Sequence, residues 1–152
     1  MTTALYNRDI LRLAASIPHL GRLAAPQASV EKRSPVCGSR VVVDLVLDGE
    51  GRVAALGQEV RACALGQASA ALMGASAIGR SAAELAAARD ALAGFLAGRR
   101  ADPGDWPGLD VLSGAQPFTA RHASILLAFE AAAEAAASAF GSKATAATAT
   151  AG

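Results

Sequence analysis

Hydrophobic residues follow two different periods along the chain. Over residues 40–47 they alternate, so that four aliphatic side chains point to one face and a more polar set, which includes Asp44, points to the other. Strict alternation predicts a half-buried β-strand. The turn residues Asp-Gly-Glu-Gly at 48–51 then reverse the chain, and residues 53–60 return as the partner strand of a hairpin. Residues 27–34 are predicted to form an edge strand.

Elsewhere the apolar positions recur at helical spacing. Residues 3–15 carry leucine and isoleucine between charged side chains, which predicts an amphipathic helix. A second helical stripe runs over residues 64–78. Ser81, followed three positions later by Glu84, has the pattern of a capping box and predicts the start of a third helix.

The C-terminal half adds one long loop and a last helix. Residues 99–117 are rich in turn residues and contain one short helical turn at 109–112. The last helix is predicted over 119–140, and the low-complexity sequence of 141–152 predicts a disordered tail. The order of elements predicts an α+β fold, in which a three-stranded antiparallel sheet packs against helices in a single domain over residues 1–140.

Composition indicates the type of core and argues against a nucleic-acid partner. Apolar residues make up 53% of the chain, but much of that share is alanine and aromatic residues are only 4%, so the core must consist of closely packed small-residue helices. Fourteen Lys and Arg against thirteen Asp and Glu give a formal net charge of +1, and no stretch contains five like charges in a row. We therefore expect no nucleic-acid partner.

Two apolar segments bear on localisation. The first 16 residues contain Arg8, Asp9 and Arg12, which a secretory signal would not tolerate, so we place the protein in a reducing cytoplasm. Residues 62–79 are 18 residues long without a charge, which is the length of a membrane-spanning helix. Glycine, serine and alanine dominate the segment, and it is better explained as a buried helix of a soluble protein with no membrane partner.

The two cysteines are the first candidates for chemistry. Cys37 precedes the strand at 40–47 and Cys63 follows the strand that pairs with it, so the hairpin brings both toward one end of the sheet. They are a disulfide, a pair of metal ligands or two unrelated buried thiols, and a reducing compartment disfavours the disulfide. Cys63 also precedes a predicted helix, whose positive end favours a thiolate.

His122, in the first turn of the last predicted helix, is the third candidate. A single histidine is more often hydrogen-bonded or solvated than a metal ligand. Its neighbour Arg121 is interpreted as a surface charge, and Trp106 as a hydrophobic anchor for the long loop. The chain contains no glycine-rich phosphate loop, no G-x-S-x-G elbow and no HExxH helix, so a hydrolase is unsupported.

Five segments follow one another along the chain: LYNRDILRLAASIPHLGRL, SPVCGSRV, DGEGRV, RACALGQASAALM and LSGAQPFTARHASILLAF. In this order they resemble the iron–sulfur cluster assembly scaffold family, the NifU N-terminal, IscU and SufU group, over about residues 4–136. The long loop from Arg99 to Pro117 favours the SufU branch. The resemblance implies a SufE/NifU-like fold.

The resemblance also implies a ligand set, from which this chain departs. The family binds zinc or a nascent cluster through three cysteines and one aspartate. Cys37 and Cys63 match the first two cysteines, whereas Ser39 stands at the aspartate position. The third cysteine falls on Ser124 or on Ala123, depending on the alignment.

The chain is therefore expected to be a divergent member with an incomplete metal site. Cys37, Cys63 and His122 become the candidate ligands, with Ser124 at the position of the missing thiol. These are three strong donors, whereas tetrahedral zinc and [2Fe–2S] clusters take four. A homodimer that shares a bridging cluster, water or a small thiol would complete the set.

The sequence thus predicts a divergent scaffold or sulfur-acceptor protein of iron–sulfur cluster assembly, an assembly factor more than an enzyme. Its cargo would be a transient iron–sulfur cluster or zinc, and the family resemblance implies a cysteine desulfurase and recipient apo-proteins as partners. The alternative is a cluster-free interaction module that docks the desulfurase or another assembly partner.

Overall fold

A three-stranded antiparallel sheet forms one layer of the protein, which we describe from a computed structural model covering residues 7–35 and 38–151, with side chains up to residue 141. The strands are β1 (Ala28–Arg33), β2 (Arg40–Leu47) and β3 (Val53–Arg61), in the order β1-β2-β3. The β2–β3 turn is closed by the Asp48 amide, which donates to the carbonyl of Arg52 at 2.7 Å. The predicted hairpin and edge strand are both confirmed.

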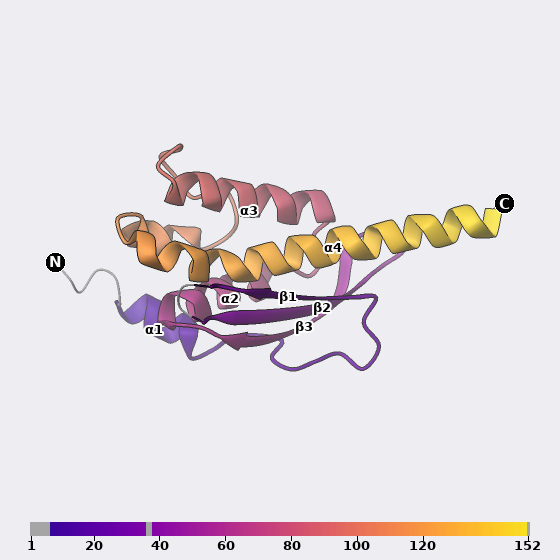
Figure 1. Cartoon of the computed structure of the whole chain (residues 1–152), viewed down its shortest axis with the longest axis horizontal. Helices are drawn as coiled ribbons and strands as arrows, with labels where there is room; N and C mark the ends of the chain where they lie inside the picture. Colours follow the sequence, from indigo (N-terminus) through magenta and orange to yellow (C-terminus); the bar gives the residue numbers. More distant parts are fainter. Residues whose placement is uncertain (1–6, 36–37, 152) are drawn as a thin grey trace.

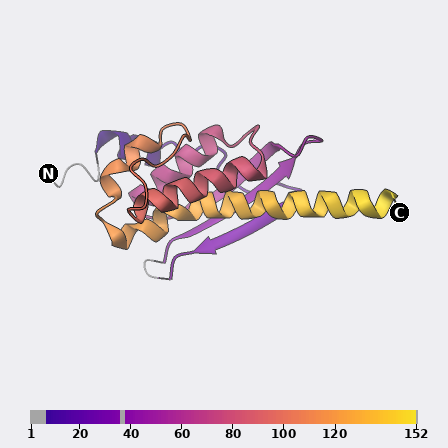
Figure 2. The same ribbon diagram turned by 90° about the horizontal axis from the view of Figure 1, so that it is seen from above.

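Most of the helices lie on one face of this sheet, and α1 lies at one end of it, beside α2 (Figure 1). α4 crosses β1 and β2, α3 packs on the side of α4 that faces away from the sheet, and α2 packs beside α4 and against α1 (Figures 1 and 2). This arrangement confirms the predicted α+β class. The helical elements are α1 (Arg8–Ala14), α2 (Ala64–Ser76), α3 (Ala82–Leu96), the 3₁₀ helices η2 (Leu109–Ala115) and η3 (Thr119–Arg121), and α4 (His122–Ala151).

The helix boundaries follow from local capping chemistry. The Asn7 side chain accepts a hydrogen bond from the amide of Ile10 at 2.9 Å and caps α1. Ser81 and Glu84 form the predicted capping box at the start of α3. α4 continues to Ala151, past the end predicted at Phe140, in keeping with the high helix propensity of alanine. Disorder of residues 141–152 stays a prediction.

Alanine allows the helices of this core to approach closely. One face of α4 is lined by alanines that are fully or almost fully buried between the sheet, α2 and α3. Thr119–Gly141 is long and apolar enough to cross a membrane, with a mean hydropathy of 1.4, but 61% of that window is buried inside the protein. The segment 62–79 forms the shorter, largely buried α2, as the composition predicts. Both apolar segments are thus core helices of this fold.

Trp106 anchors the long loop between α3 and α4, as predicted. Its indole Nε1 donates to the carbonyl of Leu72 at 2.8 Å, and its ring meets Phe129 edge-on at a centroid distance of 5.4 Å. The guanidinium of Arg80 lies 4.9 Å from the centre of the same ring. Buried aromatic contact and one satisfied indole N–H therefore hold the loop against α2 and α4.

The other face of the sheet is partly covered by the segment that joins α1 to β1. The carboxylate of Asp44 is fully buried there and accepts hydrogen bonds from Arg22 Nε at 2.7 Å, Arg22 Nη2 at 3.0 Å and the Leu23 amide at 3.0 Å. Burial alone would raise the pKa of Asp44, but the hydrogen bonds from Arg22, Ser29 and Leu23 together with the Arg22 charge lower it below its ordinary value.

Replacing Asp44 by Asn is expected to destabilise the fold by about 1–3 kcal/mol at pH 7, because Arg22 and the Leu23 amide lose a charged acceptor. The loss is limited because the Arg22 side chain is 46% exposed and water can solvate it. Since the folded-state pKa is lowered, this stabilisation is present above the unfolded-state value of about 3.9 and is lost as the pH falls through the folded value. Urea unfolding of both proteins at pH 7 and in acid measures the difference.

The matched control is Asp90→Asn, which makes the same chemical change in the Arg89–Asp90 pair, where the Asp90 side chain is 70% exposed. It is expected to change stability by less than about 0.5 kcal/mol. Equal losses for the two variants would contradict the assigned role of Asp44.

Candidate functional site

Cys63 lies where β3 passes into α2, at one end of the sheet. It is the N-cap residue of α2, with an extended backbone (φ −65°, ψ 171°), and its carbonyl accepts the Gln67 amide at 2.9 Å. The first turn of α2 contains no acidic residue, and the Cys63 side chain makes no capping hydrogen bond to its amides. Cys63 is half-buried and forms no disulfide. The sulfur therefore sits at the electropositive end of a 13-residue helix.

Two serine hydroxyls lie beside this sulfur. Ser124 Oγ, from the first turn of α4, is 3.4 Å from Cys63 Sγ, and Ser39 Oγ, from the residue before β2, is 3.1 Å from Ser124 Oγ. Ser124 and Ser39 are 1% and 5% exposed. We call Ser39, Cys63 and Ser124 the serine–cysteine cluster. Of the two positions considered for the third cysteine, Ser124 is therefore the one whose side chain is at the site.

A close approach of α2 and α4 produces this cluster. A Cβ on Gly66 would collide with Ser124 Oγ and lie 2.7 Å from the Cβ of Ala62, so only glycine permits the observed separation. One turn further along α2, Ser69 Oγ donates to the carbonyl of Ile125 at 2.6 Å. Glycine at the contact and this buried hydrogen bond set the register of α4 against α2.

Cys37 lies outside the described residues, but the structure places the residues beside it. Arg40 pairs with Arg61 in the β2–β3 ladder, so the chain before β2 and the chain after β3 leave the same end of the sheet. The loop is closed at its base, where the Ser34 amide donates to the Ser39 carbonyl at 2.9 Å. The position of Cys37 beside Cys63 stays a prediction.

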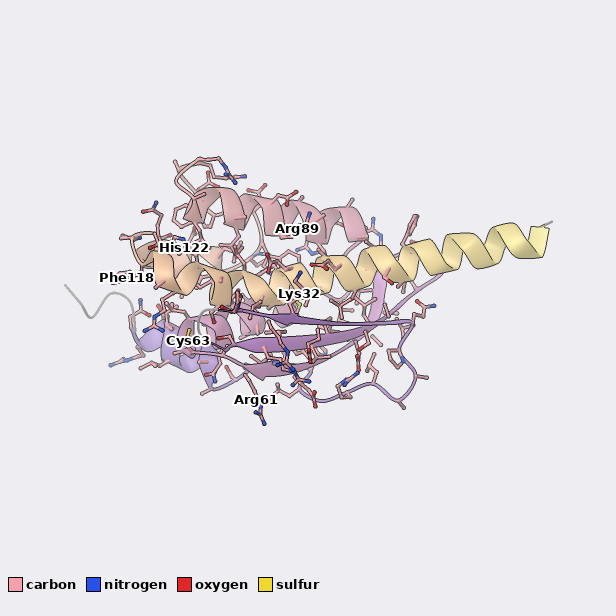
Figure 3. The ribbon with its side chains drawn as sticks, in the orientation of Figure 1. Lys32, Arg61, Cys63, Arg89, Phe118 and His122 are labelled. Atoms are coloured by element: carbon pink, nitrogen blue, oxygen red, sulfur yellow. The ribbon has the colours of Figure 1, made fainter. Side chains whose placement is uncertain are left out.

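The side chain of His122 does not lie at the serine–cysteine cluster. Its Nε2 is 2.8 Å from the carbonyl oxygen of Gln116 and 3.2 Å from that of Ala115, so this nitrogen carries the proton and donates to the end of η2. His122 and Ser124 are two residues apart, about 200° around the helix. Figure 3 shows His122 and Cys63 on opposite sides of the first turn of α4.

The described residues therefore do not assemble the predicted metal site. Among residues 7–35 and 38–141, no three His, Cys, Asp or Glu side chains gather closely enough to hold a metal ion. A ligand role for His122 stays a prediction, because its ring lies on the other side of the first turn of α4 from Cys63. In the conformation described, Cys63 is the one predicted strong donor that lies at the cluster.

A pocket of about 250 Å³ opens beside Cys63. Arg61 and Arg121 line it, and no acidic residue is among its described lining residues. Neither guanidinium forms an ion pair with any residue of the described chain. The pocket is lined by Gly38, Ser39, Arg61, Ala62, Cys63 and Arg121.

Sequence reasoning missed Arg61 and treated Arg121 as a surface charge. Both are exposed, which agrees with that interpretation as far as burial goes. Arg61 is the last residue of β3 and Arg121 immediately precedes α4, so each comes within two or three residues of a cluster member. This proximity to Cys63 and Ser124 along the chain is the signal that would have found them.

Comparison with known proteins identifies solved relatives. The structure resembles the crystal structure of the N-terminal part of a nitrogen-fixing NifU-like protein from Brucella abortus, with a TM-score of 0.86 and 38% identity. That match covers 92% of this chain and 97% of the other. Scans against protein-family models and against curated proteins match nothing.

Two more distant structures share the fold. One is described as an iron–sulfur cluster assembly scaffold for the SUF system from Fervidobacterium islandicum AW-1, with a TM-score of 0.78, 19% identity and coverage of 90% of this chain and 99% of the other. The other is described only as a hypothetical protein, with a TM-score of 0.77, 24% identity and coverage of 88% and 98%. At these identities the likeness is one of fold.

Replacing Gly66 by Ala is expected to cost about 1–3 kcal/mol of folding stability and to separate Ser124 from Cys63, because the new methyl group overpacks the contact between α2 and α4. Urea unfolding measures the first effect, and the rate at which a neutral thiol reagent modifies Cys63 in a Cys37→Ser background measures the second. The rate is expected to rise.

Gly141→Ala, also in a helix but with nothing within 4 Å of the added Cβ, is the control and is expected to leave stability unchanged or slightly higher. If Gly66→Ala behaves like Gly141→Ala, the close approach does not govern the cluster.

Proposed function

The chain belongs to the family of NifU-like N-terminal proteins, and on that basis we propose that it is a divergent scaffold or sulfur-acceptor protein of iron–sulfur cluster assembly. Cys37 and Cys63 hold the nascent cluster or receive sulfur, and the protein acts as an assembly factor rather than a turnover enzyme. The observation that supports this most directly is the convergence of Ser39, Cys63 and Ser124 from three separate elements at one end of the sheet.

The donor set fits a cluster only in part. Thiolate is the usual ligand of iron in such clusters, and one chain supplies two cysteines, Cys37 and Cys63. The hydroxyls of Ser39 and Ser124 replace a carboxylate and a thiol and are much weaker donors. Two protomers that face each other would bring four thiolates to one [2Fe–2S] core, so the proposal includes a homodimer in the loaded state. Zinc is the alternative cargo of the same thiolates.

The proposed partners follow from the family. A cysteine desulfurase delivers sulfur, and recipient apo-proteins accept the finished cluster. In the sulfur-acceptor variant, the half-buried Cys63 is the described thiol to which sulfur would be delivered, because it lines an open pocket. We place these steps in the cytoplasm, where thiols stay reduced.

A second function is favoured by the hydrogen bonds within the serine–cysteine cluster. Ser124 hydrogen bonds with both Ser39 and Cys63, so each of the three side chains has a protein partner. This is the arrangement expected of a cluster-free module that keeps the scaffold shape and docks a desulfurase or another assembly protein. The two functions differ in whether iron and sulfide bind.

Anaerobic reconstitution of the purified protein with ferrous iron and sulfide separates these functions. About one iron and one acid-labile sulfide per chain are expected, which corresponds to a [2Fe–2S] cluster shared by two chains. Both are expected to be lost in Cys37→Ser and in Cys63→Ser, with Ser138→Ala, an exposed position of α4, as the control. Absence of bound iron and sulfide in the unaltered protein would instead support the docking module.

Replacing Ser124 by Cys restores a thiol 3.4 Å from the sulfur of Cys63 and is expected to strengthen cluster retention. Resistance of the reconstituted cluster to a chelator is expected to rise by at least about tenfold, since even outer-shell partners of metal ligands contribute that much. Ser138→Cys adds a thiol to the same helix, 14 residues and about 21 Å away, and is expected to have no effect. If the iron–sulfur cluster resists the chelator equally well in both variants, position 124 is not at the site that binds the iron–sulfur cluster.

A further inference from the structure

The pocket beside Cys63 is positively charged, and it lies next to Ser124, which stands where the resemblance implies a third cysteine ligand. Arg61 and Arg121 line it, the N-terminus of α2 begins at Cys63, and no described residue of the lining carries a negative charge. Uncompensated guanidinium groups beside a helix N-terminus attract anions. The pocket therefore favours a ligand that brings its own negative charge.

The arginine-lined pocket beside Trp106 lacks this property. The pocket of about 360 Å³ beside Trp106 contains Arg80 and Arg100, but these are ion-paired with Glu84 at 3.4 Å and with Asp102 at 3.0 Å. The charges of that pocket are therefore neutralised within the chain. The positive charge beside Cys63 is not neutralised by any described residue.

The shape of the pocket limits the size of the ligand. Its volume is about 250 Å³, and three of its lining residues, Gly38, Ser39 and Ala62, are small. A small molecule can therefore reach Cys63 from solvent. Ser124 contacts the sulfur of Cys63 and Ser39 contacts Ser124, so the two positions beside the sulfur carry hydroxyls, which are weak metal donors.

We propose that this pocket binds a small anionic thiol, whose carboxylate pairs with Arg61 and Arg121 and whose sulfur lies beside Cys63. Carboxylate and guanidinium form bidentate, charge-assisted hydrogen bonds, which hold the molecule in one orientation. When an iron–sulfur cluster is bound, the sulfur of this molecule would supply the thiolate ligand that Ser124 cannot. This last step rests on the proposed function, whereas binding of the anionic molecule does not.

Thiol–disulfide exchange in metal-free protein tests the charge preference. In the Cys37→Ser variant Cys63 is the one remaining thiol of the chain. Its thiolate attacks one sulfur of a symmetric disulfide, a new S–S bond forms, and the electron pair of the broken bond leaves on the released thiolate, so that Cys63 is oxidised and the probe is reduced. The probes are 3,3′-dithiodipropionate, bis(2-hydroxyethyl) disulfide and cystamine, which are anionic, neutral and cationic.

Each exchange rate is divided by the rate of the same probe with 2-mercaptoethanol, which removes differences in intrinsic reactivity. The anionic probe is expected to react fastest and the cationic probe slowest. Arg61→Ala and Arg121→Ala are each expected to lower the anionic-to-neutral ratio by about fivefold, the factor that corresponds to two unit charges at about 4 Å in water. Arg61→Lys and Arg121→Lys keep the positive charge and are expected to keep most of the anionic-to-neutral ratio. Salt at 1 M is expected to abolish the ratio.

Arg89→Ala is the control, because Arg89 is a half-buried arginine of α3 that lies away from Cys63 (Figure 3). It is expected to leave the ratio unchanged. Equal normalised rates for the three probes, or a ratio that survives replacement of both Arg61 and Arg121, would overturn the proposal.

Reconstitution with iron and sulfide in the presence of 3-mercaptopropionate or cysteamine tests the ligand role. More iron per chain is expected with the anionic thiol, and the excess is expected to disappear in Arg61→Ala. Equal iron with both thiols overturns the ligand role. No iron with either thiol contradicts the proposed function, and the exchange ratio still decides whether the pocket binds the anion.

Discussion

The candidate site depends on the close contact between the N-terminal turns of α2 and α4. Gly66 provides the room for Ser124, and the hydrogen bond from Ser69 to the carbonyl of Ile125 holds the two helices in register. Every other member of the site is positioned relative to this contact. β3 delivers Cys63 to the start of α2, and the chain entering β2 brings Ser39 against Ser124. A shift of α4 by one residue would rotate Ser124 by about 100° and remove it from the cluster.

Much of the fold is predictable because its signals are local. Alternation in residues 40–47 and the Asp-Gly-Glu-Gly turn predict the central hairpin, which the structure contains. Ser81 and Glu84 predict the start of α3, since both halves of a capping box lie within four residues. Trp106 is the single tryptophan in a loop of turn residues, and a large aromatic in such a loop needs a buried surface.

The site is less predictable because its geometry depends on contacts between distant segments. Ser39 and Ser124 are 85 residues apart, and no local pattern shows that their hydroxyls meet. The orientation of His122 follows from the carbonyls at the end of η2, a 3₁₀ helix longer than the helical turn that the sequence predicts. Burial of Asp44 similarly requires the segment around Arg22 to fold across the sheet, which alternation along β2 alone does not show.

The serine–cysteine cluster has a consequence for the empty protein. A site built from three thiolates and a carboxylate crowds like charges together when no cation is present, and such crowding opposes folding. Here Ser39 and Ser124 place neutral hydroxyls at the two positions where the family resemblance implies a carboxylate and a thiol, and these hydroxyls hydrogen bond within the serine–cysteine cluster. The folded chain therefore carries less repulsion between like charges at this end of the sheet than a site of three thiolates and a carboxylate would.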